Sequence, residues 1–124
     1  MLNFTIERET AEEITSISVM PNDKNALVSL NVENVPFSYN SKSIQKKISI
    51  LEYAKLKDEV QTLSLEKIFH ENLGSMFLDG WTLRFAVLSG STELKIEVQC
   101  PEKSDAKPET TKLLDFCEKF FSFS

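Results

Sequence analysis

The sequence predicts one domain of the α+β class, with a single, mostly antiparallel sheet packed against two main helices. An N-terminal meander of strands and a C-terminal hairpin are expected to form the sheet. Several short segments alternate apolar and polar residues, which is typical of strands with one buried and one wet face. In two places the spacing becomes helical. With 124 residues, 41% of them hydrophobic and 27% charged, the chain has the size and composition of one folded domain, residues 1–124.

The N-terminal half is expected to form a meander of antiparallel strands. Pro21 should end the second strand because proline has no donor for the sheet ladder. The residues Asn22 to Asn25 then form a turn of favourable composition. An acidic connector, Glu9 to Glu13, joins the first two strands, and a loop rich in serine and asparagine precedes the fourth. The expected strands are 2–7, 16–20, 26–32 and 44–50.

Helical spacing follows the fourth strand. Tyr53, Leu56, Val60 and Leu63 fall on one face of a helix, with charged residues on the other face. Ser64 is placed to cap a second, short helix that reaches Phe69.

The last third of the chain predicts a hairpin and a closing helix. Apolar residues occupy the odd positions of 81–87 and the even positions of 94–100, alternating in the second segment with Glu93, Lys95, Glu97 and Gln99. Ser89 to Ser91 supply the small residues of a short turn. Ser104 and Asp105 are candidate caps for the helix, and Pro108 suits its first turn. Its apolar stripe comprises Leu113, Leu114, Phe116, Cys117, Phe120 and Phe121.

No residue pattern predicts a catalytic, cofactor or metal site. His70 is the single histidine, and no local motif pairs it with a serine or cysteine nucleophile. Cys100 and Cys117 lack the close paired spacing of zinc ligands. Both fall on apolar faces, which favours buried reduced thiols over a disulfide. The isolated glycines Gly74, Gly80 and Gly90 form no phosphate loop and mark turns instead.

Charge is the feature that bears on function. The formal net charge of −5 argues against direct binding of nucleic acid. Residues 1–41 hold six acids and two bases, a balance of −4 and nearly the whole excess. Acidic turns can simply keep a small protein soluble, or they can form a surface complementary to a basic protein. On the second interpretation the candidate partner-binding residues are Glu9, Glu12, Glu13, Asp23 and Glu33.

The C-terminal part resembles the immunity proteins of contact-dependent growth inhibition and related polymorphic-toxin systems. The resemblance covers roughly residues 78–121. It is carried by Leu78-Asp79-Gly80-x-Thr82-Leu83, the turn at Gly90, Pro101, Pro108, and a helix containing Leu114, Phe116-Cys117 and Phe120-Phe121. It implies a stoichiometric inhibitor, without an enzymatic activity of its own, that binds one cognate bacterial toxin.

The resemblance also implies the kind of partner and the cellular location of the protein. The partner would be a basic, nuclease-like toxin, and the protein a cytoplasmic monomer with no cofactor and no membrane association. The N-terminus, rich in glutamate, lacks the apolar run of a signal peptide. The alternative is a cytosolic secretion chaperone, which would dimerise and hold an extended segment of one client. An enzyme is the third possibility, and it would need His70, Cys100 or a carboxylate set in a pocket.

Overall fold

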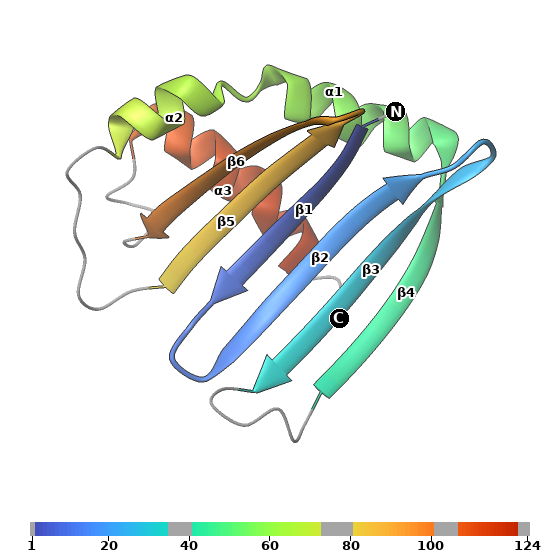
Figure 1. Cartoon of the computed structure of the whole chain (residues 1–124), viewed down its shortest axis with the longest axis horizontal. Helices are drawn as coiled ribbons and strands as arrows, with labels where there is room; N and C mark the ends of the chain where they lie inside the picture. The colour runs from blue at the N-terminus through green and yellow to red at the C-terminus, as the bar shows by residue number, and fades with distance from the viewer. Residues whose placement is uncertain (1, 35–40, 73–80, 101–106, 122–124) are drawn as a thin grey trace.

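Six strands form one antiparallel sheet in a computed structural model that describes residues 2–34, 41–72, 81–100 and 107–121 (Figure 1). The strands are β1 (Leu2–Glu9), β2 (Glu13–Pro21), β3 (Asn25–Asn34), β4 (Ser41–Ser49), β5 (Trp81–Ser89) and β6 (Thr92–Cys100). The helices are α1 (Ile50–Thr62), α2 (Leu65–Glu71) and α3 (Pro108–Phe121). The α+β class and the single antiparallel sheet are as the sequence predicts.

The strand order is β4-β3-β2-β1-β5-β6, so the first strand in sequence lies inside the sheet. The meander from β1 to β4 forms one side, and the β5–β6 hairpin adds to the free edge of β1. In this pairing Phe4 lies opposite Val87, and Glu7 lies opposite Arg84. All five strand pairs are antiparallel.

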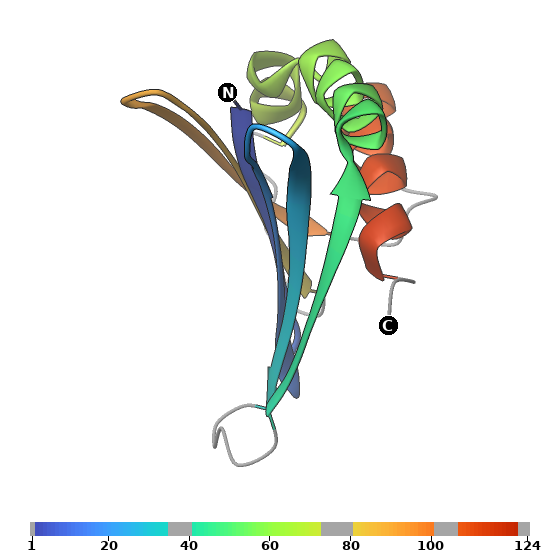
Figure 2. The same cartoon turned by 90° about the vertical axis from the view of Figure 1, so that its right-hand side faces the viewer.

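All three helices lie on the same side of the sheet (Figure 2). Serine side chains start two of them: Ser49 Oγ accepts a hydrogen bond from Glu52 N at 3.0 Å, and Ser64 Oγ accepts one from Lys67 N at 3.3 Å. Each bond satisfies a donor that the first turn of a helix leaves without a partner. The other face of the sheet carries no element among the described residues.

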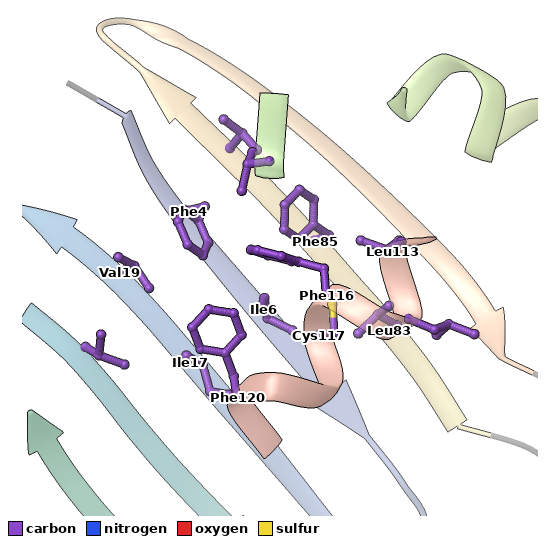
Figure 3. Close-up of a cluster of buried hydrophobic side chains, with 14 of the residues drawn as sticks. Phe4, Ile6, Ile17, Val19, Leu83, Phe85, Leu113, Phe116, Cys117 and Phe120 are labelled. Atoms are coloured by element: carbon purple, nitrogen blue, oxygen red, sulfur yellow. The ribbon is translucent and has the colours of Figure 1, made fainter. Parts of the chain in front are cut away.

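The core fills the space between the sheet and α3, and aromatic rings are at its centre (Figure 3). The ring of Phe4 lies 5.7 Å from that of Phe116 and 6.0 Å from that of Phe120, measured between centroids. Phe85 meets the Phe116 ring edge to face at 6.2 Å. Cys117 also lies within this layer and is buried, as predicted. The side chain of Cys100 lies outside the described residues.

The strands extend further than the alternation alone predicts. β1 continues to Glu9 and β2 begins at Glu13, which shortens the acidic connector to three residues. Ile50, expected in the fourth strand, is instead the first residue of α1. Leu94 has the inward parity but is 56% exposed, near the tip of the hairpin.

Gly90 begins the β5–β6 turn with φ of +61°, which glycine adopts without strain. Several other predicted features lie outside the described residues: the glycines at 74 and 80, the Asp79-Gly80 turn, and the caps Ser104 and Asp105.

Candidate partner-binding surface

The uncovered face of the sheet displays mostly polar and small side chains. One row across it joins Ser29, Ser18, Thr5, Ala86 and Lys95, each directly opposite the next on neighbouring strands. The next row joins Asn31, Ser16, Glu7, Arg84 and Glu97 in the same way. These residues alternate along each strand with core residues, because successive side chains point to opposite faces. The face that the helices leave uncovered therefore differs from the core in chemistry.

Four of the five predicted partner-binding residues gather at one end of the sheet. Glu9 ends β1, Glu12 lies in the turn, and Glu13 begins β2. Glu33 lies directly opposite Ile14 near the end of β3, which places it at the same end. We call Glu9, Glu12, Glu13 and Glu33 the acidic end. It corresponds to the lower edge of the sheet in Figure 1.

The turn that carries Glu12 is held by its own hydrogen bonds. Thr10 Oγ1 accepts from Glu13 N at 3.1 Å and from Glu12 N at 3.3 Å. Thr10 N donates to the Glu13 carbonyl at 2.9 Å. These bonds fix the backbone beneath the acidic end, so its carboxylates are presented on an ordered turn.

Asp23, the fifth predicted residue, lies at the opposite end of the strands. It belongs to the β2–β3 turn, where Asn22 Oδ1 accepts from Lys24 N and Asn25 N, both at 2.9 Å. A strand of nine residues separates the two turns by roughly 26–30 Å at about 3.3 Å per residue. The structure therefore does not bring Asp23 together with the other four.

Arg84 is the centre of an ion-pair network that the sequence reasoning missed. Its Nη1 donates to Glu7 at 2.8 Å and to Glu9 at 3.1 Å, and its Nε donates to Glu97 at 3.2 Å. The hydrogen bond that Arg84 donates to Glu7 is the largest cause that raises the pKa of Arg84 above its usual value, so the guanidinium stays charged. The network connects the acidic end, through Glu9, with the middle of the uncovered face.

His70 does not belong to the Arg84 ion-pair network. It is exposed near the end of α2, and its Nε2 lies 3.9 Å from Glu66 Oε1. Cys117 is only 1% exposed, between α3 and the sheet. Among the described side chains, no group of three or more His, Cys, Asp or Glu is arranged to hold a metal ion. The uncovered face, with its rows of polar and charged side chains, is therefore the candidate partner-binding surface among the described residues.

A second polar cluster joins α2 to α3 on the helical side. The Glu71 carboxylate accepts hydrogen bonds from Thr110 N and Thr110 Oγ1, both at 2.8 Å, and from Glu109 N at 3.0 Å. Burial raises the pKa of Glu71, but these bonds together with the charge of Lys107 outweigh it and lower the pKa. Asn72 Nδ2 donates to the same Thr110 hydroxyl at 2.9 Å. The cluster supplies hydrogen-bond acceptors for backbone N–H groups at the start of α3, which is a structural role.

Comparison with known proteins gives no relative from which a role could be transferred. No family model matches the chain, and no curated protein matches it significantly. Within the part of the chain that the structure describes, no helix is both long and apolar enough to cross a membrane.

Proposed function

We propose that this protein is an immunity protein that binds one basic, nuclease-like bacterial toxin with one-to-one stoichiometry and thereby neutralises it. The observation that carries the proposal is the acidic end. Glu9, Glu12, Glu13 and Glu33 are spread over 25 residues of sequence but share one end of the sheet. The family resemblance of residues 78–121 supports the same class of function.

The acidic end suits recognition of a basic protein for two physical reasons. Clustered carboxylates attract a basic surface over distance and so raise the association rate. The ordered turn at Thr10 also lowers the conformational entropy lost on binding, since the backbone is already fixed. Both effects act without any chemical step by this protein.

The first test is co-expression with the product of the gene immediately upstream. We expect that product to be toxic alone, growth to be rescued by this chain, and a one-to-one complex to elute from size-exclusion chromatography with light scattering. The association rate should fall as salt is added, because screening weakens steering by exposed charges. A toxic product that the chain neither binds nor neutralises would refute the proposal for that pair.

Charge reversal locates the contact. Glu12→Lys combined with Glu33→Lys should weaken both protection and association, since both side chains are exposed at the acidic end. Asp23→Lys is the matched control at the other end of the strands. Equal loss with both variants would indicate a partner that contacts both ends. Loss with Asp23→Lys alone would move the contact away from the acidic end.

A secretion chaperone is the second candidate, and the uncovered sheet face favours it. A broad polar face of this kind can hold an extended client segment as well as a folded toxin. The chaperone interpretation predicts a dimer and a client that is partly unfolded in the complex. A monomeric chain bound to an enzymatically active, folded partner would exclude it.

A further inference from the structure

The uncovered face contains a groove that crosses the central strands. Its floor is made of small side chains, since Ser18, Thr5 and Ala86 lie side by side on β2, β1 and β5. These three side chains are small, and the space above them, which Arg84 and Lys95 also line, measures about 520 Å³. We call this space the cross-strand groove. It extends from Asn31 on β3 to Lys95 and Glu97 on β6.

One wall of the groove is acidic. Glu7 and Glu97 line it, and together with Glu9 they surround Arg84. Three carboxylates against one guanidinium leave a balance of −2. Lys95 also lines the groove, but its charge is offset by an ion pair with Glu93 at 3.1 Å. Arg84 uses one oxygen of each carboxylate, so it orients them while leaving the cluster negative. A cationic side chain in the groove would meet this wall at short range.

The opposite side of the groove includes two exposed apolar side chains. A second hollow of about 170 Å³ shares Thr5, Ser18 and Ala86 with the groove. Its further lining residues are Met20, Leu88, Phe4, Asn3 and Glu93. Met20 and Leu88 are 51% and 40% exposed. Exposed methionine and leucine beside small residues offer contact area to an apolar side chain. The groove therefore combines a negative wall with exposed apolar side chains at its border.

We propose that the cross-strand groove docks a single amphipathic segment of the toxin, with a lysine or arginine against Glu7 and Glu97 and an apolar side chain against Met20 and Leu88. The inference rests on the proposed function and adds the chemistry of the contact. Charge complementarity selects the occupant, because the wall is negative and Glu9 joins it to the acidic end. The groove holds the segment after the acidic end has attracted the toxin.

The length of the segment follows from the sheet. From β3 to β6 the groove crosses four strand spacings, or about 19 Å at ~4.8 Å each. About six extended residues or about 13 helical residues cover that distance. A displayed library of random peptides of about 13 residues therefore samples both forms. Selected on the immobilised full chain, it should yield peptides that combine Lys or Arg with apolar residues.

Binding of selected synthetic peptides is then measured by fluorescence anisotropy against four variants. Ala86→Trp fills the groove, and Glu97→Lys reverses the charge of its wall at an exposed position. Each should weaken binding roughly tenfold or more, the effect expected of a central contact. The controls are Gln61→Trp, which adds the same bulk on exposed α1, and Asp23→Lys at the far end of the strands. Both controls should leave binding within about twofold.

The possible results distinguish failure of the groove inference from failure of the proposed immunity function. Peptides that bind Ala86→Trp and Glu97→Lys as tightly as the wild type, or that lack basic residues, would overturn the groove inference. A wild-type chain that dimerises while Ala86→Trp is monomeric would assign the face to a second copy, which also overturns it. Thermal melting shows whether Ala86→Trp is misfolded. If it is, peptide binding to Glu97→Lys tests the groove inference. If basic peptides bind through the groove but the chain gives no protection from the toxin, only the immunity function is refuted. If the chain protects from the toxin but no such peptides are selected, only the groove inference is refuted.

Discussion

The two faces of the same sheet differ sharply, although they are made by alternate residues of the same strands. Phe4 is 1% exposed beneath α3, whereas its neighbour Thr5 is exposed on the floor of the cross-strand groove. The covered face is mainly apolar from β3 to β6, and the uncovered face carries mostly serine, threonine, alanine and charged residues. Because folding free energy comes mainly from apolar burial, the covered face stabilises the fold. The proposed partner contact uses the uncovered face, which contributes less to this stability.

The sharpest test of this comparison replaces the two neighbours in β1. Phe4→Ala should lower the free energy of unfolding by about 3–5 kcal/mol, the usual cost of a buried phenylalanine. Thr5→Ala should change it by about 1 kcal/mol or less, since the exposed threonine contributes mainly strand propensity. Urea unfolding followed by circular dichroism measures both. Equal losses would mean that the uncovered face is itself buried in solution.

A smaller effect is expected at the polar junction of the helical layer. Glu71→Gln should cost about 1.5–3 kcal/mol near neutral pH, the range for hydrogen bonds to a charged group. The native structure lowers the pKa of Glu71, so its contribution is fully present above the ordinary pKa of 4.5 and is lost as the pH falls through the native value. The gap between wild type and variant should narrow in acid. A gap that stays constant from neutral to acidic pH would contradict the role of the charge.

The next effect concerns the link between α1 and the start of β1. Tyr53 Oη donates to the Leu2 carbonyl at 2.6 Å and accepts from Leu2 N at 3.1 Å. Tyr53→Phe should therefore cost about 0.5–1.5 kcal/mol. Amide hydrogen exchange should accelerate at the first residues of β1 and stay unchanged in β3. Uniform acceleration throughout the sheet would show that the hydroxyl supports the whole fold instead.

The smallest effect is expected on the uncovered face itself. Arg84 and its carboxylate partners are more than one third exposed, so Arg84→Met should change stability by about 1 kcal/mol or less. Loss of the guanidinium leaves Glu7, Glu9 and Glu97 to repel one another. Any destabilisation should accordingly shrink at ~1 M salt, where the Debye length is about 3 Å. A loss of stability as large as that of Phe4→Ala would contradict the inference that the covered face supplies most of the stability.

The elements of this fold were predictable because their signals are local. Alternation indicates which residues of each strand face inward, and Ser64 lies where α2 begins, as predicted. The strand order was not predictable, since it depends on pairing between distant segments. The Arg84–Glu7 ion pair joins residues 77 apart, and no local pattern marks it.

The candidate surface was predictable in part. Charge alone indicated Glu9, Glu12, Glu13 and Glu33, and the structure places them together. The separation of Asp23 follows from geometry, because successive turns of a meander lie at opposite ends. Glu97 was recognisable as a residue of the wet face, but its connection to Glu9 through Arg84 required the position of β5 beside β1.

The central position of β1 has a consequence for how the chain reaches its native state. β1 can pair with β2 as soon as both strands exist, but its other edge stays unpaired until β5 is available, more than 70 residues later. Non-local pairing of this kind slows folding, because the entropy of closing a long loop must be overcome first. Until then the four-stranded meander exposes an apolar edge strand that can pair with other chains. Pairing of the β5–β6 hairpin with β1 covers this edge and completes the native sheet.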